Sequence, residues 1–244
     1  MKLDSLAKFP HLEPDKMPAS IPEPFAEDFS IVFLGNLNPA IFHPEWLLRH
    51  GLIGAEAGAS AEVVVISPQV SEFTVGQTAL HCDENMLQIS TNQDTYSEQV
   101  LDLAIGVLTT LPHTPLRAGG INHEARYNLD SFEYWHAIGH SIVPKDPIWS
   151  SISENPGTLK VSVRSPVTGW DYALEENFTV EPFQQGQRQT PSLAVRANLH
   201  FPIPSDDSSS TALVERFLND KWEAASKRAL AVAASIFKNT RNLV

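Results

Sequence analysis

Near the middle of the chain the sequence reads TPLRAGGINHEARYNL from Thr114 to Leu129 and continues as DSFEYWHAIGH from Asp130 to His140. From about Ile121 to Leu129 apolar and polar residues alternate, which predicts a long strand over about 115–129. Asp130 then suits the N-cap of a helix that begins directly after this strand. We therefore expect a long strand that feeds straight into a helix, with the other elements arranged around it.

The segments on both sides of this stretch predict further strands and helices. Before it, the patterns predict strands at 29–34, 62–67 and 78–91, the last with a break at 83–85, and helices at 43–50 and 95–111. After it, they predict strands at 159–164, 174–183 and 193–201, and one long amphipathic helix at 211–238. Several of these strands carry apolar residues on one face only, which is typical of antiparallel sheets.

The order of these elements predicts an α+β fold, with a mostly antiparallel sheet and helices packed mainly on one face. The order nearly repeats, as strand, helix, strands, helix, in residues 29–113 and again in 114–244. Because residue identities hardly repeat, two structurally similar halves and a chance likeness both remain open. Residues 1–28 form a separate part that is rich in proline, and we expect an extended arm there because proline fits neither a helix interior nor a central strand.

Alternation also predicts which polar side chains lie on the face that the helices leave open. The strongest candidates for a partner-binding surface are Asn122, Arg126, Arg164, Arg196 and Asn198. Arginine is favoured at protein interfaces because its planar fork makes paired hydrogen bonds and stacks. The competing interpretation is a sheet face that is simply covered by water.

Three histidines give a second hypothesis for a functional site. His136 and His140 are four residues apart on the predicted helix and therefore share a face, and His123 on the preceding strand could supply a third nitrogen. The pattern lacks the glutamate that zinc proteases place between two such histidines. Histidines that pack within the core explain the same pattern.

Composition limits the kinds of partner. The formal net charge is −12, with 17 basic against 29 acidic residues among 244. Such a field repels phosphate backbones and anionic lipid, so we expect neither nucleic acid nor membrane as a partner.

Cys82 is the only cysteine, which excludes an internal disulfide and suits a buried structural thiol. The N-terminal residues lack the apolar run of a signal peptide, and we expect a cytoplasmic protein.

Together these patterns favour a non-catalytic cytoplasmic interaction protein, such as a subunit, adaptor or inhibitor. It would bind another protein or itself through the polar sheet face, the N-terminal arm or the last helix, and we expect no cofactor. The alternative is a metal-dependent enzyme that uses His123, His136 and His140. A third reading is a small-ligand binder with its site between the sheet and the helices.

Overall fold

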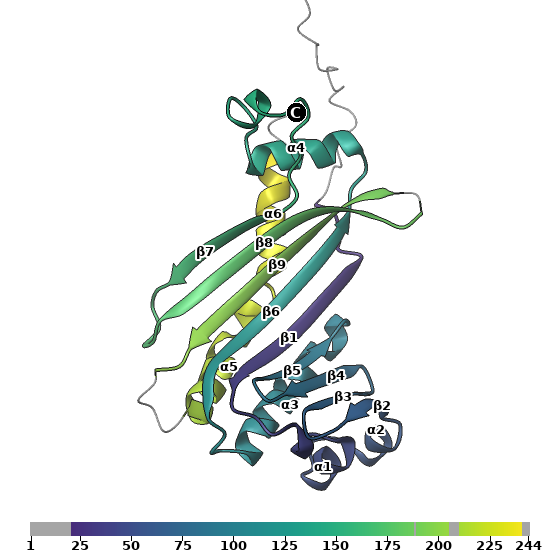
Figure 1. Cartoon of the computed structure of the whole chain (residues 1–244), viewed down its shortest axis with the longest axis vertical. Coiled ribbons are helices and arrows are strands. Elements are labelled where there is room, and N and C mark those ends of the chain that lie inside the picture. The colour runs from purple at the N-terminus through teal and green to yellow at the C-terminus, as the bar shows by residue number, and fades with distance from the viewer. Residues whose placement is uncertain (1–20, 188, 205–209, 241–244) are drawn as a thin grey trace, which may run out of the picture.

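A computed structural model describes residues 21–187, 189–204 and 210–240 of the chain. Within these residues the protein is a single open sheet of nine antiparallel strands in the order β2-β3-β4-β5-β1-β6-β9-β8-β7. Helices α3, α5 and α6 pack against this sheet, and α5 and α6 lie behind β6, β8 and β9 in Figure 1. The predicted α+β fold, with helices mainly on one face, is confirmed.

The bounds of the elements are as follows. The strands are β1 (Ala26–Gly35), β2 (Glu62–Ile66), β3 (Val70–Val75), β4 (Thr78–Asp83), β5 (Met86–Thr91), β6 (Leu116–Asn128), β7 (Val161–Val167), β8 (Leu174–Gln185) and β9 (Thr190–Pro202). The α-helices are α1 (Pro44–Arg49), α2 (Ala55–Ala59), α3 (Ser97–Thr110), α4 (Phe132–Ile142), α5 (Ser210–Ala225) and α6 (Arg228–Thr240).

The centre of the sheet is the antiparallel pair of β1 and β6. From β1 the chain passes through α1 and α2 to the outer edge at β2, and returns through β3, β4 and β5 to the side of β1. From β6 it passes through α4 to the opposite edge at β7, and returns through β8 and β9 to the side of β6. This path agrees with the predicted order of elements, while the structural similarity of the two halves stays a prediction.

The core lies between the sheet and the helices and forms two clusters. The larger cluster joins the first part of the sheet to α3 and α5, and includes Ile31, Phe33, Leu87, Val107 and Phe217. The smaller cluster joins β6, β8 and β9 to α4 and α6, and includes Tyr127, Leu193, Val195, Ile138 and Phe237. Burying these large side chains removes apolar surface from water and is the main stabilising contribution to the fold.

The double glycine of β6 allows α5 to approach the sheet closely. A Cβ atom at Gly119 would lie 3.1 Å from Cγ1 of Val214 on α5, which is closer than side chains normally pack. At Gly120 a Cβ atom would lie on the other face, 3.4 Å from Nδ2 of Asn198. The absence of a side chain at Gly119 therefore lets α5 pack directly on β6. The register of β6 against its neighbours is regular at both glycines.

The structure corrects several predicted bounds in the sheet. Strand β1 begins at Ala26, earlier than the predicted start at Phe29, and residues 1–20 of the predicted arm lie outside the described residues. Strand β3 was not predicted, because its buried face carries Ser71 beside Phe73 and Val75 and so breaks the apolar alternation. The predicted break at 83–85 is a hairpin turn, in which the Asp83 carboxylate accepts hydrogen bonds from two backbone N–H groups.

The prediction of one long C-terminal helix was wrong. The helix is interrupted after Ala225, and α6 begins at Arg228. The sequence holds neither glycine nor proline at this point, so no local signal marks the break. The backbone N–H of Ala229, in the first turn of α6, instead donates to Nδ1 of His123 on β6 at 3.3 Å. A tertiary contact thus satisfies one of the free N–H groups that every helix start exposes.

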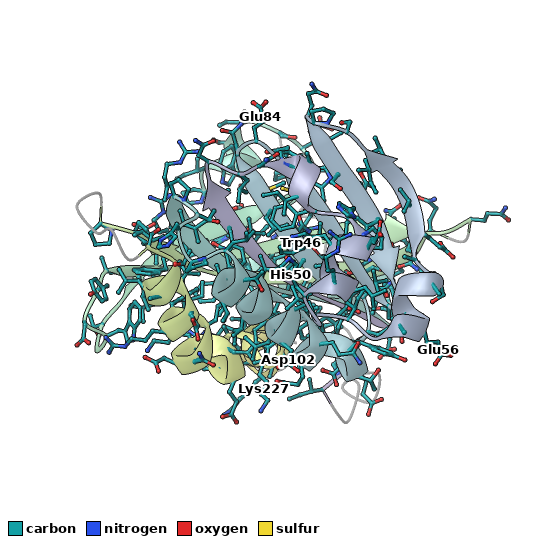
Figure 2. The ribbon with its side chains drawn as sticks, turned by 90° about the horizontal axis from the view of Figure 1, so that it is seen from below. Trp46, His50, Glu56, Glu84, Asp102 and Lys227 are labelled. Carbon is teal, nitrogen blue, oxygen red and sulfur yellow. The ribbon has the colours of Figure 1, made fainter. Side chains whose placement is uncertain are left out.

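Figure 2 shows the molecule from below the view of Figure 1, with strands and helices both in sight. Asp102 of α3 and Lys227, between α5 and α6, lie on its outer surface, away from the sheet. Trp46 of α1 and His50, which caps the C-terminal end of that helix, lie side by side with ring centroids 4.7 Å apart. Among the described residues, no helix has the length and apolar character needed to cross a membrane.

A polar hollow on the open face of the sheet

The face of the sheet opposite the helices holds a hollow of about 830 Å³. It extends from β3 to β8 and is centred on the β1–β6 pair. We call it the polar hollow and define it by its polar lining residues apart from the buried His123: Asp28, Ser30, Thr74, Gln77, Gln88, Ser90, Thr91, Asn92, Asn122, Glu124, Arg126, Asn177, Thr179, Arg196 and Asn198. The intervening residues of the same strands point into the core, so alternation along each strand produces this surface.

A row of hydrogen-bonded side chains crosses the floor of the polar hollow. Asn177 of β8 donates to Asn198 of β9 at 3.2 Å, and Asn198 donates to Asn122 of β6 at 2.7 Å. Asn122 then donates to Ser30 of β1 at 3.1 Å. Each pair is opposite in strand register. The row is therefore ordered before any ligand arrives, and each amide keeps one N–H and one lone pair available.

Ion pairs form a second row beside the amides. Arg196 of β9 lies between Glu124 of β6 and Glu181 of β8, and its Nη1 is 2.6 Å from Glu181 Oε2. Arg126 lies against Asp28 and has its Nε 3.2 Å from Glu124 Oε1, too poorly aligned to donate a hydrogen bond. Burial disfavours the charge on Arg196, but the hydrogen bonds to Glu124 and Glu181 outweigh it and raise the pKa of the guanidinium.

The charges of the polar hollow balance one another. Asp28 and Glu124 are its acidic lining residues, and Arg126 and Arg196 are its basic ones. The hollow is thus neutral on a chain whose formal net charge is −12. A surface with balanced, paired charges selects a partner through hydrogen-bond geometry more than through bulk attraction.

Four of the five residues proposed from the sequence line this hollow, namely Asn122, Arg126, Arg196 and Asn198. Arg164 of the edge strand β7 lies outside it and continues the amide row, with its Nε 3.3 Å from Asn177 Oδ1. The polar and apolar side chains of β6 lie on opposite faces of the sheet, as expected, because Ile121 and Tyr127 are buried in the core on the other side.

Sequence reasoning missed the part of the hollow that the first strands contribute. Ser30 comes from the strand predicted at 29–34 and Asp28 from the last residue of the predicted arm, while Gln88 and Ser90 come from β5. The alternation of Gln88 and Ser90 with the buried Leu87 and Ile89 was the signal that could have identified them.

The structure does not bring His123 together with His136 and His140. Among the described residues, no group of three or more histidine, cysteine, aspartate or glutamate side chains is placed to hold a metal ion. His123 is buried, stacks on Phe29 and has its Nε2 2.9 Å from a carboxylate oxygen of Glu27. His136 and His140 line a different, small pocket beside α4.

The hydrogen bonds of His123 define its protonation state. Nδ1 accepts the N–H of Ala229, so the proton of the neutral ring is on Nε2 and is donated to Glu27. Burial lowers the pKa of His123, and the Glu27 carboxylate only partly opposes this effect. His123 is therefore a neutral structural residue that joins β1, β6 and α6.

The interior bears on two expectations from the sequence, namely a buried Cys82 and a ligand site between the sheet and the helices. Cys82 is buried, as expected, and burial raises the pKa of its thiol to about 12. The space between the sheet and α3 near Phe33 and Val107 is a void of about 10 Å³, which is no larger than one water molecule needs. That part of the interface has no room for a small-molecule ligand.

No protein-family model and no curated protein matches this sequence. The fold and the site therefore define the protein only as an open antiparallel α+β sheet with a polar hollow on its helix-free face.

Proposed function

We propose that the protein is a non-catalytic interaction module that binds a partner protein through the polar hollow. The observation that carries the proposal is the hollow itself, about 830 Å³ in volume and lined from β3 to β8 by amides, hydroxyls and paired charges. Concave surfaces with convergent polar groups are the default places for recognition. A cytoplasmic location belongs to the same proposal and rests on the sequence.

The amide row supports binding because it is already ordered. Asn122, Asn177 and Asn198 hold one another in place, so a partner would not have to order these side chains. Preorganisation of this kind lowers the entropic cost of association. The free N–H and lone pair of each amide fit the backbone and polar side chains of a protein surface.

The hollow is also the best supported of the three surfaces considered from the sequence. The apolar residues of the last two helices, such as Phe217, Trp222 and Phe237, are buried against the sheet and are not available to a partner. Most of the proline-rich arm lies outside the described residues. The hollow, by contrast, keeps its polar groups on the face that α3, α5 and α6 leave open.

The proposal is tested by comparing one double variant with one matched control. The wild-type protein first captures its partner from native lysate, and the purified partner is then titrated calorimetrically. We expect Asn122→Ala/Asn198→Ala to weaken binding at least about tenfold, since two recognition amides are lost. Asp102→Ala, on the outer surface of α3, should bind like the wild type. Capture of no partner, or equal affinity of the double variant, contradicts the proposal.

A further inference from the structure

Lys145, in the loop that follows α4, is a buried lysine that forms no ion pair with an acidic residue in the described part of the chain. The residue as a whole is only 6% exposed, and its ammonium contacts the hydroxyl of Thr158. Thr158 in turn donates to the backbone carbonyl of Gly139 at 3.0 Å. None of the ion pairs among the described residues involves Lys145.

Lys145 lines a small pocket together with His136 and His140 of α4. The two histidines are four residues apart and share one face of the helix. The other lining residues are Trp135, Gly139, Pro156, Gly157, Thr158 and Pro182. The lining thus holds three basic side chains and a hydroxyl but no carboxylate, on a chain that is acidic overall.

A buried ammonium without a counter-charge is costly, because water no longer stabilises the ion and no carboxylate replaces it. Burial accordingly lowers the pKa of Lys145. An anion in the pocket would supply the missing charge and would accept hydrogen bonds from the ammonium, whereas the hydroxyl hydrogen of Thr158 is already donated to Gly139. The protonated ammonium of Lys145 would repel a divalent cation.

The volume of the pocket limits the size of the anion. It is about 30 Å³, and one water molecule needs roughly 10–15 Å³ on the same measure. Two or three oxygen atoms fill this space, which matches one edge of a carboxylate or phosphate. A nucleotide or a sugar would have to remain largely outside.

We propose that the pocket formed by Lys145, His136, His140 and Thr158 binds a single oxyanion group, either a carboxylate or a phosphate. The pocket lies beside α4, at one end of the sheet, and its residues are separate from those of the polar hollow. The proposal is therefore independent of the proposed function. It assigns His136 and His140 a role in anion binding.

The test is an NMR titration of the full ¹⁵N-labelled chain with sodium phosphate and, separately, with sodium acetate at constant ionic strength. Gly139 and Gly157 line the pocket, so the NMR signals of their backbone amides should report on occupancy. We expect saturable shifts of both amides with at least one anion, and the anion that binds more tightly identifies the oxyanion class. Absence of saturable shifts with both anions would overturn the proposal.

Two variants separate this site from general surface binding. Lys145→Met keeps the length of the side chain and should weaken anion binding at least tenfold, whereas Lys160→Met, at a nearby exposed lysine, should leave it unchanged. Equal affinity of Lys145→Met and the wild type would contradict the site. If Lys145→Met loses its dispersed spectrum, the double variant His136→Asn/His140→Asn decides, and unchanged affinity in that variant overturns the proposal.

Discussion

Asn198 of β9 donates a hydrogen bond of 2.7 Å to Asn122 of β6, the residue directly opposite it in the sheet. This contact lies at the middle of the amide row and at the floor of the polar hollow. Because both side chains are polar and half-buried, their arrangement affects both the stability of the sheet and the surface offered to a partner.

The amide pair should contribute measurably to stability. Asn198→Ala and Asn122→Ala are each expected to lower the free energy of unfolding by about 1–2 kcal/mol, since each removes two hydrogen bonds of the amide row and leaves the neighbouring polar groups to find water. Urea unfolding of both single variants and the double variant measures their coupling. Strictly additive losses would show that the two amides do not interact.

Gly119 should not tolerate a side chain, because α5 is too close. Gly119→Ala is expected to lower the free energy of unfolding by about 1–3 kcal/mol through overpacking against Val214. Gly119→Ala/Val214→Ala should recover part of this loss. Gly120→Ala is the matched control on the same strand, where the added atom meets only ordinary contacts. Equal losses at both glycines would contradict the close approach.

His123 should make stability fall as the pH is lowered. Its pKa in the folded protein is below the ordinary value of 6.5, so below that pH the unfolded chain takes up a proton that the folded protein resists. The contribution of His123 is therefore complete above pH 6.5 and decreases below it, with a slope of up to about 1.4 kcal/mol per pH unit.

The measurement for His123 is the difference in unfolding free energy between the wild type and His123→Gln at several pH values. Glutamine keeps an acceptor near the N–H of Ala229 but does not titrate. We expect the advantage of the wild type to shrink as the pH falls below 6.5. A difference that stays constant or grows would show that His123 is charged in the folded protein.

Cys82 should be unreactive until the protein unfolds. With its pKa raised from 9.0 to about 12, the thiolate fraction at pH 8 falls roughly thousandfold, and burial also blocks access. A thiol reagent should therefore label the native protein very slowly and the urea-unfolded protein rapidly. Since Cys82 is the only cysteine, the signal is unambiguous. Rapid labelling of the native protein would contradict the burial.

The sequence was sufficient for those parts of the fold that depend on local patterns. Alternation in β6 and β9 predicted both strands and the face on which Asn122, Arg126, Arg196 and Asn198 lie. The start of α4 was predicted to within one residue, since the N-cap is Ser131 and the predicted N-cap was Asp130. These features depend on residues that are close in the chain, so their patterns are visible without the fold.

The features that the sequence did not predict depend on contacts between distant residues. The break between α5 and α6 coincides with the hydrogen bond from Ala229 to His123, and β3 places Ser71 in the core, where its hydroxyl donates to the carbonyl of Phe42. The grouping of His136, His140 and Lys145 likewise requires the loop after α4 to fold back onto that helix. No local pattern contains this information.

The central claim is that a partner protein occupies the polar hollow, and site-specific photo-crosslinking tests it most directly. A photoreactive amino acid is placed at Ser90 in the hollow or, as a control, at Asp102 on the outer surface of α3. After irradiation in native lysate, we predict one discrete adduct from position 90 that Asn122→Ala/Asn198→Ala abolishes, and no such adduct from position 102. Equal adducts from both positions, or none from position 90, would contradict the account.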